Sequence, residues 1–222
     1  GTGGGAAATV KVLARETTVQ RRERLVMDAV INVTWQQGPI AVWQLPHTPG
    51  TRGEPLARPC LGGALGWEPQ ALPIERDARG RPELTGALAH LGTGWTHSGG
   101  HLLVALGQGV RLGVDLERIC ERPRRDEVIA RFFHPAEVAW LQALDEPARQ
   151  HWFFRVWCAK EAILKCHGQG ISYGLHRFAL APRDGALVLV DSDAGLGPVA
   201  SWSLREWAVG TDFRAALAWQ AA

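Results

Sequence analysis

The sequence predicts an α+β protein, sandwich-like, in which helices pack on mainly antiparallel strands. Short runs of strand-forming residues, bounded by Gly, Pro and Asp, recur in the middle and at the C-terminal end of the chain. Between them, residues 151–168 form a longer and mostly apolar run with helical spacing. Short strands separated by such turns favour mainly antiparallel pairing.

Composition excludes several classes of protein. The 222 residues are 46% hydrophobic, which allows a substantial core in one domain or in two small ones. The formal charge of +2 is nearly balanced, so we expect neither nucleic acid nor a membrane as a partner, and any anionic ligand needs a local site. The four cysteines show no zinc-ligand spacing, and no apolar run approaches the roughly 20 residues that span a bilayer. We therefore expect a cytoplasmic protein with reduced thiols.

The first half of the chain contains a predicted strand, a predicted helix and a turn, preceded by an N-terminal extension. Residues 1–39 have no legible pattern and are taken as an N-terminal extension of unknown role. Residues 40–45 predict a strand, and residues 56–67 predict a helix weakened by Pro59 and a pair of glycines. A turn rich in Gly, Pro and Arg follows at residues 77–84.

The second half is expected to begin with a strand. Residues 94–106 and 109–119 flank Gly107 and Gly109, so we expect them to pair as a hairpin. We place the boundary between two subdomains here, at 40–108 and 109–222.

Two helices and several short strands complete the prediction. Residues 128–144 have helical spacing interrupted at Pro135, so one helix ends near Phe133 and another begins with Pro135 in its first turn. Gly168 stops the long helix, and strand-like runs alternate with turns over residues 176–220.

Two carboxylates on one predicted strand are the first candidate for chemistry. In "RLGVDLERI", residues 111–119, the alternation of a strand places Asp115 and Glu117 on one face, about 6 to 7 Å apart. Like charges this close disfavour each other unless a cation or hydrogen bonds compensate. The alternative, a strand that ends at Leu116 and leaves Glu117 solvated, remains open from this stretch alone.

The long helix adds a third carboxylate. Trp157, Glu161 and Lys165 fall at intervals of four and therefore lie in one stripe. An ordinary surface pair of Glu161 and Lys165 is the alternative, but the neighbouring positions are mostly apolar, and charges in a buried helix must be paired or bind an ion. With Asp115 and Glu117, Glu161 makes a set of oxygen donors suited to Mg²⁺. Lys165 beside them suits an anionic leaving group, as in phosphoryl-type transfer.

Five motifs in a fixed order resemble those of a known family. They are "RGRPEL", "WTHSGG", "GVDLE", "RFFHPAE" and "FRVWCAKEAILKCHGQGIS". Together they are similar to the 4′-phosphopantetheinyl transferases, in particular the surfactin-synthetase-activating (Sfp-type) class with its W and KEA signature. The resemblance runs from about Leu56 to Ser172 and implies two pseudo-twofold-related subdomains with coenzyme A in the cleft between them.

This resemblance also implies an activity and its partners. The expected reaction moves the phosphopantetheine arm of coenzyme A onto a serine of an acyl or peptidyl carrier protein and releases adenosine 3′,5′-bisphosphate. It implies Mg²⁺ held by Asp115, Glu117 and Glu161, with Glu161 or a metal-bound water beside it as the base. Lys165 is implied to stabilise the pyrophosphate and the leaving group. A monomer is the implied working unit.

The remaining motif positions imply contacts with coenzyme A. His97 and the hydroxyl of Thr96 match phosphate-binding positions of the family, Arg81 stands where the family has a lysine, and Lys160 is assigned phosphate or structural contact. Arg58, with Arg52, is a candidate for the 3′-phosphate.

Two features keep structural alternatives. Glu137 is either linked to the metal or caps a helix, and capping is favoured because Pro135 and Glu137 suit the first turn of a helix. The arginine-rich loop at 118–127 is either a solvated face or a docking surface for an acidic carrier protein through Arg122, Arg124 and Arg125.

Two other function classes compete. A non-catalytic binder that kept the fold is disfavoured because all four charged residues of the predicted site are present. An unrelated phosphoryl or nucleotidyl transferase is disfavoured because no P-loop motif occurs.

Overall fold

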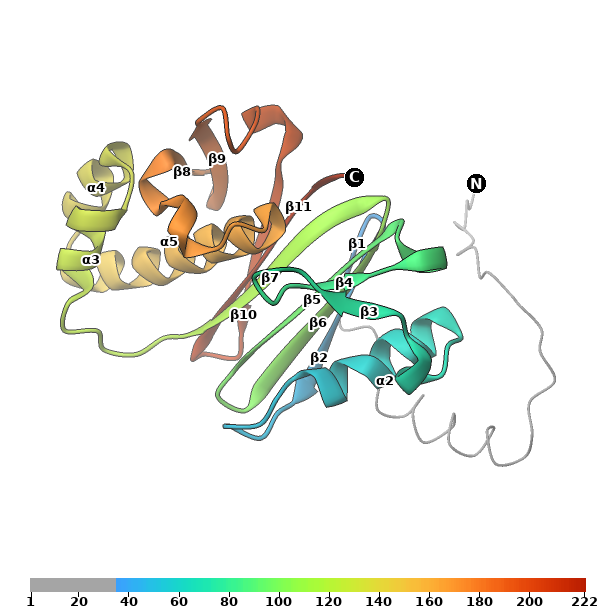
Figure 1. Ribbon diagram of the computed structural model, residues 1–222. Helices are drawn as coiled ribbons and strands as arrows, with labels where there is room; N and C mark the ends of the chain where they lie inside the picture. The colour runs from blue at the N-terminus through green and yellow to red at the C-terminus, as the bar shows by residue number, and fades with distance from the viewer. Residues whose placement is uncertain (1–34) are drawn as a thin grey trace, which may run out of the picture. The chain divides into compact units, whose positions relative to one another are not determined.

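Two antiparallel sheets and one long helix form most of the computed structural model, which describes residues 35–222 (Figure 1). The first sheet has the order β1-β2-β6-β5, and the second has the order β10-β11-β7. These strands are β1 (Trp35–Gln37), β2 (Ile40–Pro46), β5 (Leu91–Ser98), β6 (His101–Gln108), β7 (Val110–Arg118), β10 (Ser203–Val209) and β11 (Phe213–Ala221). The predicted α+β class is confirmed. Of the N-terminal extension, residues 1–34 lie outside the described residues.

Residues 35–222 also contain two small hairpins and, with the long helix included, four α-helices. The helices are α2 (Glu54–Leu65), α3 (Arg125–Phe132), α4 (Pro135–Gln142) and α5 (Glu146–His167). The hairpins join β3 (Ile74–Arg76) to β4 (Pro82–Leu84) and β8 (Phe178–Arg183) to β9 (Ala186–Ser192). No helix among residues 35–222 is long and apolar enough to cross a membrane.

The break at Pro135 and the end of α5 follow the predicted signals, whereas α5 begins at Glu146, before the predicted start at residue 151. Asp145 caps the start of α5 by accepting a hydrogen bond from the backbone N–H of Ala148, and Gly168 ends the helix in the left-handed conformation. Helix α3 ends at Phe132, and α4 begins with Pro135 in its first turn, as expected from the interruption at that proline.

The predicted hairpin across Gly107 and Gly109 is wrong. Strand β6, which includes Gly107, pairs instead with β5 across a turn at Gly99 and Gly100, while β7 enters the second sheet. Glycines make this crossing possible, since a Cβ atom at Gly92 would lie 2.1 Å from the carbonyl oxygen of Val110. The start of β7 therefore packs against β5 instead of pairing with β6.

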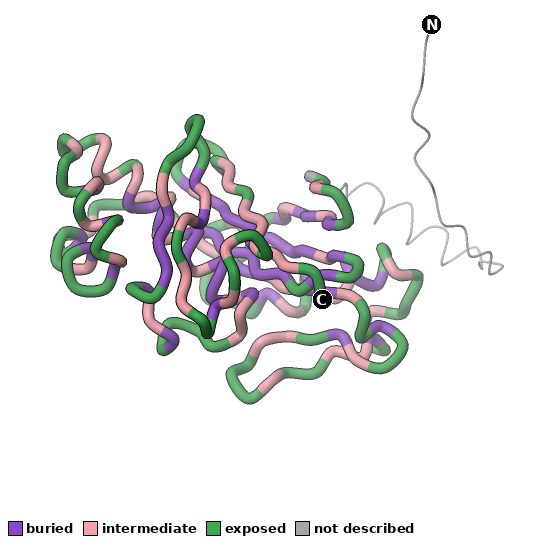
Figure 2. The backbone as a smooth tube through the Cα atoms, turned by 90° about the horizontal axis from the view of Figure 1, so that it is seen from above, coloured by how far each residue is buried: buried purple, intermediate pink, exposed green. Residues whose placement is uncertain are grey.

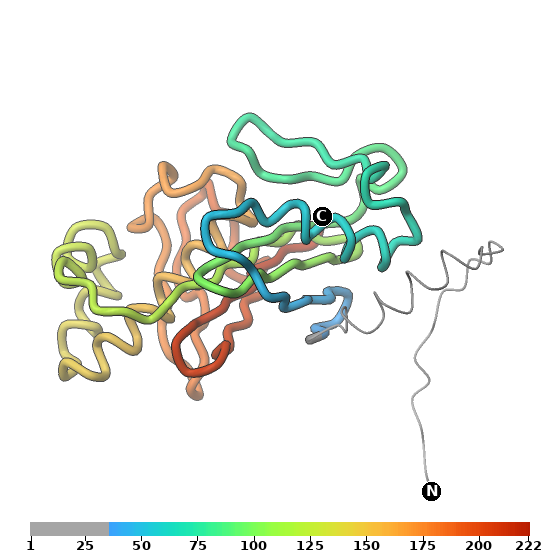
Figure 3. Tube along the Cα trace, turned by 90° about the horizontal axis from the view of Figure 1, so that it is seen from below, coloured from blue at the N-terminus to red at the C-terminus, as the bar shows by residue number. Residues whose placement is uncertain are grey.

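The two halves share one topology. In each half, the first strand is followed along the chain by helix, by a small hairpin and by two more strands. The last strand lies in the middle of the three and pairs with both others, which gives the orders β2-β6-β5 and β7-β11-β10. In Figure 3 the green strands lie between the blue and cyan segments of the first half and the orange and red segments of the second. This equivalence agrees with the expected pseudo-twofold pair. The boundaries 40–108 and 109–222 remain a prediction within one compact unit, Val33–Ala222.

The alternation of β7 divides its side chains between two cores. Leu112, Val114 and Leu116 face the first sheet and pack with residues such as Ile40 and Leu103. The opposite face of the second sheet is covered by α5, which also packs on β8 and β9. Figure 2 shows the buried residues along the central strands. Asp115 therefore faces a helix instead of solvent, which removes the alternative of a strand that ends at Leu116.

Gly113 sets the distance between β7 and α5. A Cβ atom there would lie 2.2 Å from the carbonyl oxygen of Ala162 and 2.3 Å from the backbone nitrogen of Cys166. Both contacts are with helix backbone, which cannot move aside as a side chain can. We expect Gly113→Ala to lower the free energy of unfolding by about 1–3 kcal/mol and to push α5 outwards.

Urea unfolding of this variant measures the effect, with Gly94→Ala as the matched control. A Cβ atom at Gly94 in the neighbouring strand β5 would make only ordinary contacts, at 3.5 Å or more. Equal stability of the two variants would contradict the close approach of α5.

Candidate active site

Charged side chains from β7 and α5 meet where Gly113 brings these elements together. Lys165 on α5 donates from Nζ to Oδ1 of Asp115 at 2.6 Å, to the hydroxyl of Thr96 at 3.2 Å and to the carbonyl oxygen of Val114 at 3.3 Å. One ammonium group thus joins the two halves of the fold. Although burial opposes it, the Asp115 carboxylate raises the pKa of Lys165, so this lysine is cationic.

The three predicted carboxylates lie on the same side of β7 but have different partners. Glu117 accepts from Nε1 of Trp157 at one oxygen and from Arg122 at the other, each at 3.1 Å. Oδ2 of Asp115 is buried and has no hydrogen-bond partner within residues 35–222. Glu161 lies one turn before Lys165 on the same face of α5.

Crowding of negative charge shows in the pKa values. Burial, followed by repulsion from Asp115, raises the pKa of Glu161 to about 7, although Lys165 opposes this shift. Burial and Asp115 also raise the pKa of Glu117, against the opposing effects of Arg122 and Trp157. A bound cation would relieve both effects.

The three carboxylates supply oxygen donors, which are the ligand type that a hard divalent cation prefers. No group of three or more His, Cys, Asp or Glu side chains within the described residues is already arranged as a metal site. Nevertheless, Oδ2 of Asp115 is buried without a hydrogen-bond partner among residues 35–222, and it and the Glu161 carboxylate are oxygens of the type that Mg²⁺ prefers. Part of the neutralising charge now comes from Lys165, at the other oxygen of Asp115.

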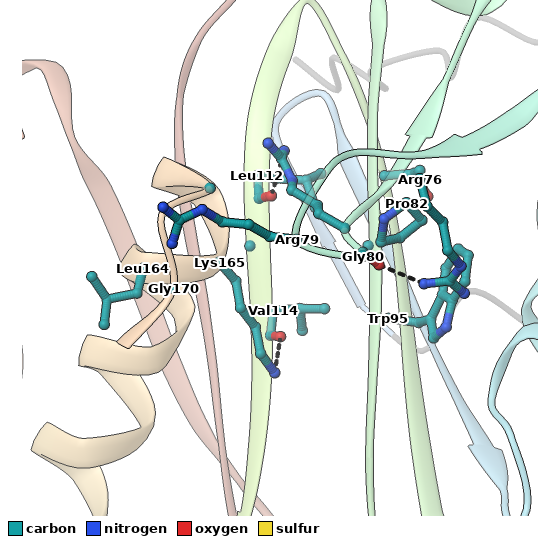
Figure 4. A pocket seen from close by; sticks show the side chains of 15 residues that line it. Arg76, Arg79, Gly80, Pro82, Trp95, Leu112, Val114, Leu164, Lys165 and Gly170 are labelled. Atoms are coloured by element: carbon teal, nitrogen blue, oxygen red, sulfur yellow. Dashed lines mark hydrogen bonds between the residues drawn. The ribbon is translucent and has the colours of Figure 1, made fainter. Parts of the chain in front are cut away.

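Two cavities meet at Lys165. The first, of about 280 Å³, lies between the two halves and is lined by residues of the β3–β4 turn, β5, β7 and the C-terminal end of α5. The second, of about 520 Å³, is lined by Arg52, Gly53, Glu54, Arg76, Trp95, Thr96, His97 and Lys165. In Figure 4, Lys165 reaches from α5 toward Val114, while Arg76 lies beside Trp95 on the other side. The cavities form a cation-lined region that adjoins the carboxylates.

Three predicted ligand residues line these cavities. Thr96 and His97 lie on β5 at the second cavity, where the His97 ring stacks on His47 with centroids 4.3 Å apart. Burial, His47 and Lys165 together lower the pKa of His97. Arg81 lines the first cavity and donates to the carbonyl oxygen of Leu112 at 3.3 Å.

The structure corrects the assignment of Lys160 to cofactor binding. Its side chain is fully buried, pairs with Glu137 at 2.9 Å and donates to the carbonyl oxygens of Leu175 and Phe178. Burial lowers its pKa to about 8 although Glu137 opposes the shift. Lys160 is an internal structural cation and reaches neither cavity.

Arg58 is also turned away from the predicted ligand. It donates to Glu54 at 2.9 Å and to the carbonyl oxygens of Pro69 and Leu72, so it ties α2 to the loop that follows. It lines neither of the two cavities, whereas Arg52 lines the second.

Two arginines that sequence reasoning missed lie at the site. Arg76 pairs with Glu54 at 2.6 Å and lies over the ring of Trp95 at 5.5 Å. Arg79 spans the cleft from the β3–β4 turn and donates to the carbonyl oxygen of Gln169 and, at 2.8 Å, to the hydroxyl of Ser172. The run of basic residues in this turn was the available signal, but only Arg81 was singled out from it.

Glu137 has the structural role that the sequence favoured. One oxygen accepts from the backbone N–H of His134 and completes the capping box of α4, and the other accepts from the backbone N–H of Leu180. Together with the Lys160 pair, these contacts fix α4 against β8.

The arginine-rich loop does not form one free basic surface. Arg122 is paired with Glu117, and Arg125 is mostly buried and paired with Asp126 and Glu146. Of the three arginines, Arg124 alone has a largely exposed side chain (85%).

Comparison with known proteins assigns the second half of the chain. The sequence profile described as "4'-phosphopantetheinyl transferase superfamily" matches residues 111–218. Residues 111–218 are therefore similar to that superfamily.

Two relatives that are named 4'-phosphopantetheinyl transferases are also similar to this chain over part of their length. The 4'-phosphopantetheinyl transferase HetI of Nostoc sp. is 36% identical over 124 residues, which cover 55% of this chain and 52% of HetI. A 4'-phosphopantetheinyl transferase of Bacillus subtilis is 27% identical over 146 residues, 66% of this chain and 63% of the relative. The chain thus spans only about half to two thirds of these relatives.

One solved structure is also similar. The Chronobacterium ammoniagenes ACPS-CoA complex is 20% identical, covers 52% of this chain and 99% of its own, and superposes with a TM-score of 0.38, which is too low to bear on the fold.

The superfamily match includes only part of the candidate site. The three carboxylates and Lys165 lie within residues 111–218, whereas the cation-lined cavity is built largely from the first half, which the profile does not cover. The superfamily match therefore bears on the carboxylate cluster, and the ligand contacts of Arg52, Arg76 and His97 are inferred from geometry.

Proposed function

We propose that this protein transfers the 4′-phosphopantetheine arm of coenzyme A to a serine hydroxyl of an acyl or peptidyl carrier protein. One observation carries the proposal: Lys165 contacts Asp115 and also lines both cavities. A carboxylate cluster suited to a hard cation thus adjoins a cavity lined by Arg52, Arg76 and His97, which suits the phosphates of coenzyme A.

The residues of the chain supply distinct parts of this reaction. The serine oxygen attacks the β-phosphorus of the coenzyme A pyrophosphate, and the bond from that phosphorus to the bridging oxygen breaks. Glu161, which lies on α5 one turn before Lys165, accepts the serine proton. Lys165 neutralises charge on the departing adenosine 3′,5′-bisphosphate, and Arg81 and Thr96 orient the pyrophosphate.

Mg²⁺ is the proposed metal, with Asp115, Glu117 and Glu161 as its protein ligands. When bound, it would neutralise the phosphate oxygens and polarise the β-phosphorus. The Sfp-type subclass, a monomeric working unit and a cytoplasmic location are parts of the same proposal.

Intact-mass spectrometry tests this function directly. We expect a panel of apo carrier proteins, incubated with this protein, coenzyme A and Mg²⁺, to show a mass gain equal to one phosphopantetheine arm. EDTA should abolish the gain, because the chain then lacks the charge that stabilises the departing phosphate. Binding of coenzyme A without modification of any carrier would contradict transfer and favour a non-catalytic binder.

A further inference from the structure

Glu117 differs from the other two carboxylates of the site because the protein holds both of its oxygens. Trp157 donates to one oxygen and Arg122 to the other, each at 3.1 Å. Oδ2 of Asp115, in contrast, has no partner among the described residues. The orientation of the Glu117 carboxylate is therefore set before any ligand binds.

The Arg122 side chain is itself fixed by α5. Its guanidinium carbon lies 5.4 Å from the ring centroid of Trp157, 5.4 Å from that of Phe154 and 5.9 Å from that of Phe153. A planar guanidinium stacks on aromatic faces and keeps its forked donors in a fixed plane. Arg122 and Trp157 thus contact each other, and each donates a hydrogen bond to a different oxygen of Glu117.

The ion pair between Arg122 and Glu117 contributes little to the stability of the fold. The side chains of Arg122 and Glu117 are 34% and 21% exposed, and a pair this accessible to water contributes about 0–1 kcal/mol or slightly more. Orientation is a stronger reason, because hydrogen bonds to a ligating carboxylate tune metal affinity.

We propose that Arg122, together with Trp157, is a positioning residue that orients the Glu117 carboxylate for a divalent cation. The inference rests on the proposed function, in which Glu117 is a metal ligand. Arg122 touches neither substrate nor metal and acts through Glu117.

The sign of the effect separates positioning from simple charge. Arg122 is a cation beside the metal site, so its removal would strengthen metal binding if Coulomb repulsion were its main influence. If orientation dominates, its removal weakens metal binding. A purely structural role predicts a change in melting temperature and no change in metal affinity.

Titration with Mn²⁺, followed by the electron paramagnetic resonance of the free ion, is the direct test. It is done on the full chain with and without coenzyme A. We expect Arg122→Ala to weaken Mn²⁺ binding about 10–100-fold. Trp157→Phe, which keeps the ring and loses the donor, should weaken it less, and Arg122→Lys should restore part of the affinity.

Arg177→Ala is the matched control. Arg177 also pairs with a carboxylate, Asp193 at 3.2 Å, and lies over an aromatic ring, that of Tyr173 at 5.0 Å, but it is outside the carboxylate cluster. It should leave Mn²⁺ affinity unchanged. In carrier modification assays, Arg122→Ala should also need more Mg²⁺ for half-maximal rate, and saturating Mg²⁺ should restore part of the rate.

Unchanged or tighter Mn²⁺ binding by Arg122→Ala would overturn the positioning role, and so would an equal loss in Arg177→Ala. Wild-type protein that binds Mn²⁺ but modifies no carrier would contradict the proposed function, while the variant titrations would still decide the role of Arg122. Wild-type protein that binds no Mn²⁺, even with coenzyme A, would overturn both.

Discussion

Asp115→Asn is expected to lower the rate of carrier modification by about 10²–10³-fold, which is the loss typical when one preorganised electrostatic group is removed from a reacting centre. The carboxylate of Asp115 holds Lys165 at 2.6 Å, and its second oxygen is buried without a partner. Asparagine keeps the shape of the side chain but removes the charge. Both metal binding and the orientation of Lys165 should suffer.

The fold should survive this change. Asp115 raises the pKa values of Glu117 and Glu161, so its neutralisation relieves repulsion within the cluster. Single-turnover modification and thermal unfolding, measured on the same preparation, separate the two effects. Glu68→Gln, at an exposed carboxylate remote from the cluster, is the control. Near-normal turnover in Asp115→Asn would exclude Asp115 from the reaction.

Lys160→Met is expected to lower the free energy of unfolding by about 3–5 kcal/mol, because it leaves a charged carboxylate buried without its partner. Lys160 and Glu137 are both fully buried and lie 2.9 Å apart. The methionine retains the length of the side chain, so the cost comes from the lost charge and from the unpaired carbonyl oxygens of Leu175 and Phe178.

Urea unfolding measures this cost, and a second substitution tests its origin. The double variant Lys160→Met with Glu137→Gln should regain part of the stability, because no uncompensated charge remains. Arg183→Met, at an exposed arginine, should change stability by less than about 0.5 kcal/mol. A folded Lys160→Met protein that is fully stable but fails to bind coenzyme A would restore the cofactor role that the structure rejects.

Local signals account for what the sequence predicted well. The end of α5, the break at Pro135 and the alternation of β7 depend on residues a few positions apart, whereas the start of α5 was predicted too late in the chain. The same local periodicity placed Trp157, Glu161 and Lys165 in one stripe and brought them to the face of Asp115 and Glu117.

Contacts between residues far apart in the sequence account for the features that the sequence analysis missed. The hairpin across Gly107 and Gly109 was wrong because β7 pairs with β11, at the other end of the second half. The direction of long side chains also depends on contacts with residues far apart in the sequence, so the sequence alone did not predict it. Arg58 and Arg76 both reach Glu54, yet Arg76 lines the cavities and Arg58 is directed at backbone carbonyls by the loop after α2. Lys160 is one residue from Glu161, about 100° around the helix, and only the packing of β8 shows that it is buried.

The pairing order of the second sheet has a consequence for biosynthesis. Asp115 lies opposite Ala216, and Glu117 lies opposite Arg214, so the strand that bears them needs β11. On the ribosome, the first sheet has all of its strands once Gln108 has emerged, whereas β7 must wait for nearly the whole remaining chain. During that interval the backbone N–H and C=O groups along the edge of β7 have no partner strand, and a nascent chain stalled before β11 would expose an aggregation-prone edge. The carboxylate cluster of the candidate site is therefore among the last features that a newly made copy completes.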